Sequence, residues 1–181
     1  MWHPRRRLSR GVENFDSFGV TYESIVLFAC IGIENLFVKV LRDNGATAER
    51  FSTTDFVKLN ALMRLNEYEV VLARYPWLSP FSPFREWKLA EPTKSLKWFD
   101  AYNKLKHDKM ASHNKATMRN AINACLGYWI VFRAVFGNAM DRRAFQSDDD
   151  DFYVKSFPQW GLHDYYLEPA DGLWRPNSAT L

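Results

Sequence analysis

The stretch WFDAYNKLKHDKM, residues 98–110, contains side-chain types that acid–base chemistry requires. Asn103 and His107 are four residues apart, so they lie side by side on one face of a helix. An imidazole exchanges protons near neutral pH, and a neighbouring amide can orient a bound group. The lysines around this pair are Lys104, Lys106 and Lys109. Because these lysines would attract an anion, the stretch predicts a candidate reactive face.

His107 also has a structural interpretation. The apolar stripe of this helix consists of Trp98, Ala101, Tyr102 and Leu105. At about 100° per residue, His107 lies at the edge of that stripe. There a half-buried imidazole would be held by a hydrogen bond to Asn103 or Asp100. The sequence leaves both interpretations open.

Glu34 is the second candidate site residue. It is the only ionisable side chain between Glu23 and Lys39, in a segment that is apolar nearly all the way round. An unpaired buried carboxylate costs several kcal/mol, so we expect Glu34 to pair with His107, Asn103 or a lysine of the same helix. A glutamate–histidine pair would orient the imidazole and keep its pKa near neutral. A purely structural ion pair is the alternative.

The remaining polar residues indicate neither a metal nor a cofactor. His3, His113 and His163 lack the spacing of metal ligands. The sequence has no glycine-rich phosphate loop and no serine nucleophile motif. Arg119 begins the last expected helix and would reach the end of the preceding one, with an ordinary surface arginine as the alternative.

The composition favours a folded domain with local basic patches. Apolar residues make up 47% of the chain and aromatic residues 16%, which excludes a disordered chain. The net charge of only +3 does not by itself indicate a nucleic-acid binder. Arginines cluster in residues 1–10 and lysines in residues 94–115, whereas the acidic run DDDD occupies residues 148–151. A polyanion could therefore bind to one basic patch.

We expect a cytoplasmic protein. Cys30 and Cys125 lie in apolar helical patterns, where cysteine behaves as a small hydrophobic residue, and two such residues do not form a disulfide framework. The basic N-terminus lacks the apolar core of a signal peptide. The longest apolar run, residues 24–33, ends at Glu34 and is shorter than the roughly 20 residues that span a bilayer.

The elements that would position these residues are mainly helices. The predicted helices cover residues 14–42, 54–65, 94–109 and 114–136. In the last of them, the apolar stripe expected to face the core consists of Met118, Ile122, Cys125, Trp129, Phe132 and Phe136. Prolines make residues 76–93 an ordered loop, and extended structure is confined to residues 66–76 and 152–168. The predicted fold is all-α, an up-and-down helical bundle of four or five helices with a long ordered loop and a short extended C-terminal tail.

Three regions follow from this organisation. Residues 1–12 form a basic mobile arm, residues 13–145 form the helical bundle, and residues 146–181 form an acidic linker and an extended tail that packs on the bundle. The aromatic content exceeds what one small core needs, which indicates an interface or partner surface.

Over residues 14–140 the chain resembles the HEPN superfamily. The similarity lies in IGIENLFVKVL at 31–41, YNKLKH at 102–107 and ATMRNAINA at 116–124. This superfamily consists of all-α domains from bacterial toxins, phage-defence systems and RNA-processing proteins. Its active members are metal-independent endoribonucleases with an arginine, a polar residue, three variable positions and a histidine.

The resemblance implies roles for particular residues. Asn103 matches the polar position and His107 the histidine, which acts as acid or base in 2′-hydroxyl attack. Tyr102 occupies the position of the arginine, so the charge on the phosphate would fall to Lys104, Lys106 or Arg119, with Lys109 as a further RNA contact. Family members build a shared cleft from two copies of the histidine-bearing helix, which implies a homodimer, and an antitoxin or defence partner protein is also implied.

Two hypotheses remain. The first is a HEPN-like RNA-directed protein, either a metal-independent endoribonuclease of toxin or phage-defence type that uses His107, or a non-cleaving version that binds RNA or a nucleotide. The second is a dimeric helical interaction module in which His107 is structural.

Overall fold

The computed structural model describes residues 12–136 and 152–159. In chain order the elements are η1 (Val12–Asn14), α1 (Val20–Asp43), α2 (Thr53–Leu62), η2 (Leu65–Glu67), β1 (Glu69–Leu72), α3 (Lys97–His107), α4 (Lys109–Ser112), η3 (His113–Lys115), α5 (Met118–Phe136) and β2 (Phe152–Ser156). The three η elements are short 3₁₀ helices. The chain is mostly helical, as predicted, with one small two-stranded sheet.

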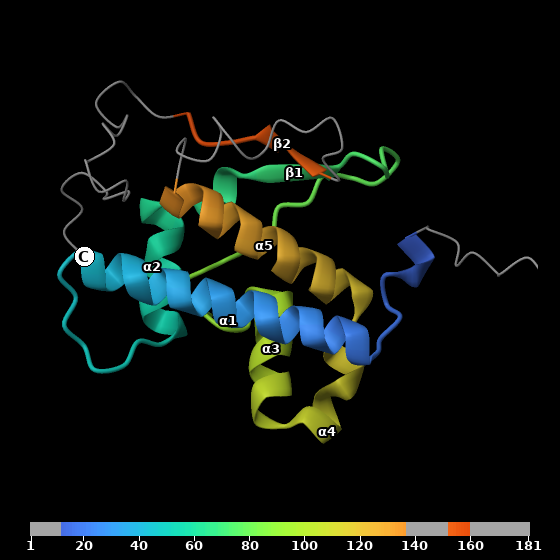
Figure 1. Ribbon diagram of the computed structural model, residues 1–181, viewed down its shortest axis with the longest axis horizontal. Coiled ribbons are helices and arrows are strands. Elements are labelled where there is room, and N and C mark those ends of the chain that lie inside the picture. Colours follow the sequence, from blue (N-terminus) through green and yellow to red (C-terminus); the bar gives the residue numbers. More distant parts are fainter. Residues whose placement is uncertain (1–11, 137–151, 160–181) are drawn as a thin grey trace, which may run out of the picture.

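α1 and α5 form the centre of the structure and run in the same direction. The Gly19 N–H donates to the Ala116 carbonyl (3.2 Å), and the Met118 N–H donates to the Ser17 carbonyl (2.8 Å). These bonds tie the first turns of the two helices together, and the helices then lie side by side (Figure 1). The predicted up-and-down arrangement of neighbouring helices therefore does not hold for this pair.

The buried face of α5 is made of small and branched residues. It consists of Ala121, Ala124, Leu126, Gly127, Ile130, Val131 and Val135. A Cβ atom on Gly127 would lie 3.2 Å from the Trp98 side chain, so the glycine lets α3 approach closely. The prediction that the Met118–Phe136 stripe faces the core holds only in part: Met118, Ile122, Trp129 and Phe136 are half-buried against the core, whereas Cys125 is exposed. Trp129 also packs edge to face on Phe152 of β2, with ring centroids 5.1 Å apart.

The segment between β1 and α3 packs aromatic side chains against the helices, as its prolines and aromatics predicted. Phe37 of α1 stacks on Trp87, with centroids 5.7 Å apart. Trp98 of α3 meets Phe84 edge to face, and its indole N–H donates to the Pro83 carbonyl at 2.9 Å. This segment thereby closes the core between α1 and α3.

The extended segments were predicted in the right places. β1 and β2 pair antiparallel, and Val70 of β1 also exchanges hydrogen bonds with Phe81. The helix ends differ by a few residues: α3 stops at His107 because Asp108 turns away from the helical conformation and its side chain caps α4 by accepting from the Ala111 N–H at 3.1 Å. The predicted arm, the acidic run and most of the tail lie outside the described residues.

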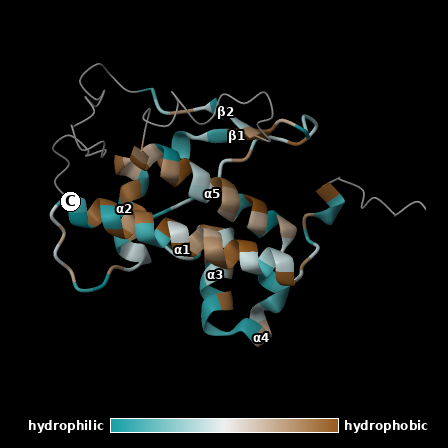
Figure 2. Ribbon diagram, viewed as in Figure 1, coloured by the Kyte–Doolittle hydropathy of each residue, from teal (hydrophilic) through white to brown (hydrophobic). Residues whose placement is uncertain are grey.

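α1 is more apolar over a greater length than predicted. Among the described residues, it is the one helix long and apolar enough, by length and composition, to cross a bilayer. The prediction that its apolar run is too short is wrong, because that run continues on both sides of Glu34. Only 33% of the most apolar stretch of α1 is buried inside the protein. Figure 2 shows more hydrophobic colouring along α1 and α5 than along α3.

Replacing Gly127 with valine should lower the free energy of unfolding by about 1–3 kcal/mol, because the added methyl groups press against the buried rings of Trp98. Chemical denaturation monitored by circular dichroism measures this change. Gly19→Ala is the matched control, since nothing lies within 4 Å of its added carbon. Equal stability of Gly127→Val and wild type would refute the close α3–α5 contact.

Candidate functional site

Two carboxylates of α1 face the histidine- and lysine-bearing segment formed by α3, α4 and η3. Glu23 and Glu34 are eleven residues apart. At about 3.6 residues per turn this is three turns, so both side chains leave α1 on the same side. Each carboxylate contacts two side chains of that segment. The α1 carboxylates therefore hold Tyr102, Lys106, Lys109 and His113 directly.

Glu34 binds Tyr102 and Lys106. Its Oε2 accepts a hydrogen bond from the Tyr102 hydroxyl at 2.8 Å and lies 3.2 Å from the Lys106 ammonium. The same ammonium lies over the Tyr102 ring, 5.2 Å from its centroid. The prediction that Glu34 pairs with this helix is confirmed, and its charged partner is Lys106. The Glu34 side chain remains 25% exposed.

Tyr102 is fully buried, and its hydroxyl is committed to Glu34. Burial and the adjacent carboxylate raise the pKa of Tyr102 above its ordinary value, so the hydroxyl stays protonated and donates. In this arrangement the hydroxyl cannot also donate to a phosphate. Tyr102 thus holds α3 to α1, whereas the resemblance places a phosphate-binding group at this position.

His107 is exposed at the end of α3 and has no hydrogen-bond or ion-pair partner among the described residues. The Asn103 amide donates to the Phe99 carbonyl at 3.1 Å, and Asp100 pairs with Lys104. The structural interpretation of His107, a half-buried imidazole bonded to Asn103 or Asp100, is therefore wrong. The proposed Glu34–His107 pair is not formed either.

The three predicted RNA-binding lysines all reach carboxylates while staying exposed. Lys104 pairs with Asp100, Lys106 with Glu34, and Lys109 with Glu23. Their side chains remain 50%, 47% and 64% exposed, respectively. Pairing therefore lowers their local charge without hiding them from a ligand.

Arg119 belongs to a different neighbourhood. Its guanidinium lies 3.5 Å from the Asp16 carboxylate and 4.8 Å from the centroid of the Phe15 ring. Both partners precede α1. Arg119 is thus engaged by the N-terminal segment, and the structure does not bring it to Glu34, Asn103 or His107 by any contact within the described residues.

Glu23 is the site residue that the sequence analysis missed. It is only 2% exposed, and its two oxygens lie 2.6 Å from the Lys109 ammonium and 3.0 Å from His113 Nδ1. These partners cover the carboxylate at the edge of the fold. Hydrogen bonds from Lys109 and then His113 hold the pKa of Glu23 below its ordinary value, although burial acts in the opposite direction.

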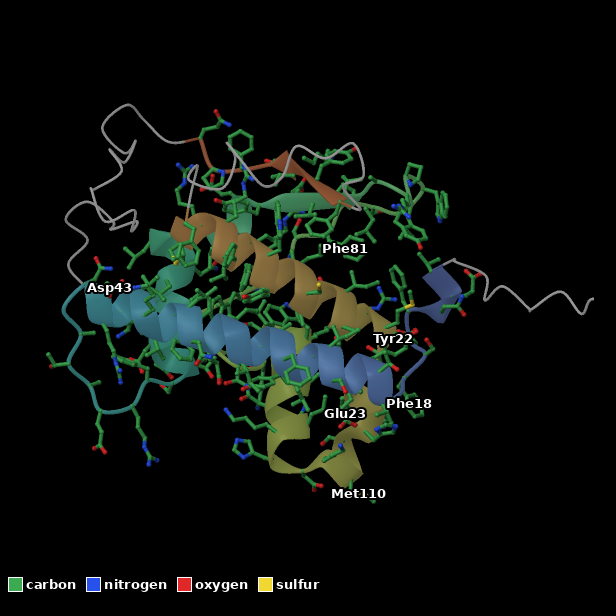
Figure 3. The ribbon with its side chains drawn as sticks, in the orientation of Figure 1. Phe18, Tyr22, Glu23, Asp43, Phe81 and Met110 are labelled. Atoms are coloured by element: carbon green, nitrogen blue, oxygen red, sulfur yellow. The ribbon has the colours of Figure 1, made fainter. Side chains whose placement is uncertain are left out.

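The bond to Glu23 orients the His113 imidazole. In the neutral tautomer whose Nδ1–H donates a hydrogen bond to the carboxylate, Nε2 is an acceptor, an arrangement suited to acid–base work. The Phe18 ring meets the imidazole edge to face, with centroids 5.6 Å apart. Figure 3 shows Glu23, Phe18 and Met110 at the same end of the molecule, where α1 begins and α4 lies.

One signal in the sequence could have identified Glu23. Its eleven-residue spacing from Glu34 puts both carboxylates on one side of the helix, so an argument that Glu34 needs a partner applies equally to Glu23. Histidine spacing alone could not have identified His113, because its contact with Glu23 depends on how α4 and η3 return to α1.

The described residues contain no group of three or more histidine, cysteine, aspartate or glutamate side chains that could hold a metal ion. An open pocket of about 600 Å³ lies against α2, lined among others by Asn60, Arg64 and Trp87. None of the α3–α4 residues lines it. His107, Lys104, Lys106 and Lys109 are all exposed.

Comparison of the chain with family models, curated proteins and solved structures gives no match. These comparisons therefore assign no family.

Tyr102→Phe should lower the free energy of unfolding by about 1–2 kcal/mol, because it removes a buried donor from a carboxylate while conserving volume. Lys106→Ala should cost less than about 1 kcal/mol, because that ion pair is exposed. Denaturant titration of both variants measures the difference. A larger loss for Lys106→Ala would show that the ion pair, and not the tyrosine, holds α3 to α1.

Glu23→Gln should destabilise the protein most at neutral pH, by about 1–2 kcal/mol. A lowered pKa in the folded state stabilises the fold above the ordinary value of 4.5, and this stabilisation is lost as the pH falls through the lower folded value. The difference in free energy of unfolding between wild type and variant should therefore become smaller below pH 4.5, as measured by denaturation at several pH values. Glu49→Gln, at an exposed position, is the control, and a difference that is constant with pH contradicts the assignment.

Proposed function

We propose that this is a HEPN-like RNA-directed protein that binds single-stranded RNA on the exposed surface of α3 and α4, with His107 as its acid–base group. The observation that carries the proposal is the state of His107. Its imidazole is exposed, has no partner among the described residues, and follows two exposed lysines on the same helix. An exposed imidazole that no other side chain holds can contact a ligand bound beside the lysines.

RNA can compete for the lysines. Each of Lys104, Lys106 and Lys109 forms an ion pair with a carboxylate. Exposed pairs of this kind contribute only about 0–1 kcal/mol each, so a polyanion can displace or share them at low cost. The resulting affinity should depend strongly on salt, because binding releases counterions from the RNA.

The proposed reaction requires only the RNA and an imidazole. His107 takes the proton of a 2′-hydroxyl, the 2′ oxygen bonds to the adjacent phosphorus, and the bond from phosphorus to the 5′ oxygen breaks. The leaving oxygen takes up the proton, and the products are a 2′,3′-cyclic phosphate and a 5′-hydroxyl. Because Tyr102 is occupied by Glu34, Lys104 and Lys106 would supply the positive charge, as single point charges without the fork of an arginine.

A second candidate function is a helical interaction module. It is favoured by the apolar surface that α1 and α5 leave exposed, where Phe28 is 76% accessible. This function needs no reactive histidine, so RNA binding and cleavage distinguish the two candidates.

Wild-type protein should bind fluorescent single-stranded RNA at low salt, and replacing Lys104, Lys106 and Lys109 with glutamine should weaken binding at least tenfold. Three lost phosphate contacts should also reduce the slope of log affinity against log salt by roughly 2. The matched control replaces Lys58, Lys88 and Lys155, which are equally exposed and also ion-paired, with glutamine. Equal losses in the two triple variants, or no binding by wild type, would refute the proposal.

Cleavage should proceed in the presence of a metal chelator and should leave a 2′,3′-cyclic phosphate. His107→Ala should abolish it while leaving the melting temperature and most of the RNA binding unchanged, because the side chain is exposed. End-group analysis of the products and thermal denaturation measure the two effects. Undiminished cleavage by His107→Ala would exclude His107 as the acid–base group, and binding without any cleavage would leave an RNA-binding protein.

A further inference from the structure

The outward side of α1 and α5 forms a second surface, which we call the α1–α5 face. It consists of Ile25, Phe28 and Ile31 of α1 and Cys125, Tyr128 and Phe132 of α5. We propose that this face is the contact between two copies of the chain. The proposal is independent of RNA binding, because none of these residues belongs to α3 or α4.

The exposure of these side chains is unusual for large apolar residues at the centre of a fold. Phe28 is 76% exposed, Ile31 45%, and Ile25 and Tyr128 37% each. Ile25, Phe28 and Ile31 follow one another at spacings of three residues on α1, so they form a continuous stripe and not scattered positions. A contiguous apolar patch of this kind marks a contact surface.

Gly32 joins the two helices into one surface. A Cβ atom at this position would lie 2.6 Å from the Tyr128 ring, so only glycine lets Tyr128 lie across α1. α1 and α5 lie side by side and run in the same direction (Figure 1), and the Gly32–Tyr128 approach brings their outward stripes together. A partner therefore meets a two-helix surface, against which the same pair from a second copy can pack.

The charge of the face fits a second copy. From residue 24 to residue 35, α1 carries no ionisable side chain on its outward side, since Glu34 turns toward α3. Charge returns only near the helix end, where Lys39 and Asp43 pair at 2.8 Å and Arg42 is exposed. A two-fold axis would bring this surface onto itself, and an uncharged surface can do so without opposing like charges.

The polar groups on the α1–α5 face also favour contact with a protein over contact with a bilayer. The Ser24 hydroxyl already donates to the Val20 carbonyl at 3.1 Å, so it can be covered without loss. The exposed Asn35 amide makes no hydrogen bond within the described residues. A second copy can satisfy this amide across the two-fold axis, whereas hydrocarbon cannot.

This contact differs from the dimer that the HEPN resemblance implies. There, two histidine-bearing helices face each other, whereas here α3 lies on the other side of α1 from the partner. The two arrangements are distinguished by which substitutions separate the copies.

Sedimentation equilibrium of the full chain at tens of micromolar tests the proposal. Wild type should sediment as a dimer, and Phe28→Asp should raise the dimer dissociation constant at least tenfold while retaining the wild-type circular dichroism spectrum. Leu89→Asp is the matched control, because Leu89 is 63% exposed and lies outside the face. A monomeric wild type overturns the proposal, and so does a dimer that Phe28→Asp leaves intact.

A second measurement uses Cys125 and does not depend on how any core variant folds. Cys30 is buried, so a thiol-directed spin label should attach at the exposed Cys125 alone. Dimerisation through the α1–α5 face should give one inter-label distance shorter than the roughly 36 Å length of α1. A longer distance places the contact elsewhere. If monomeric protein instead co-sediments with phosphatidylcholine vesicles, and Phe28→Asp prevents this, the occupant is a bilayer and the proposal fails.

Discussion

The structure depends on the pairing of two α1 carboxylates with the segment from α3 to η3. Glu34 holds α3 through a buried tyrosine hydroxyl, and Glu23 holds α4 and η3 through a lysine and a histidine. A helix as apolar as α1 tolerates these charges only because each has partners at hydrogen-bond distance. The same two contacts fix where every candidate functional side chain of α3 and α4 lies relative to the core.

This arrangement separates two kinds of surface. The side of α1 that carries the carboxylates meets hydrophilic helices with exposed lysines and an unpartnered His107. The opposite side carries no charged residue between residues 24 and 35 and exposes large apolar side chains. One helix therefore separates the surface proposed to bind RNA from the face proposed to contact a second copy, and the two proposals do not involve the same residues.

Helices, turns and strands could be predicted from local signals. Asp43, Gly45 and the three prolines of the long loop mark boundaries that depend only on neighbouring residues, and the observed elements begin and end close to them. The face of α5 that is fully buried could not be predicted. A 3–4 spacing of large apolar residues shows that a stripe exists, but the small residues opposite it determine where other helices can approach. The large residues are instead partly covered by β2 or left on the outside.

The candidate site was predictable only in part. The cost of a lone carboxylate correctly placed Glu34 against α3, since that argument depends on burial alone. The burial cost alone could not show whether Lys106 or His107 is the partner of Glu34. These two residues are adjacent on the helix, yet one side chain reaches α1 and the other points to solvent. His113 depends on long-range contacts, and no local pattern encodes its approach to Glu23.

The parallel pairing of α1 with α5 has a consequence for biosynthesis. The bonds that join Ser17 to Met118 and Gly19 to Ala116 link positions about a hundred residues apart in the chain. During translation α1 leaves the ribosome long before its principal partner exists, and contacts of such high sequence separation form slowly. The apolar side chains of α1 are then accessible to chaperones and to other nascent chains until α5 has been synthesised.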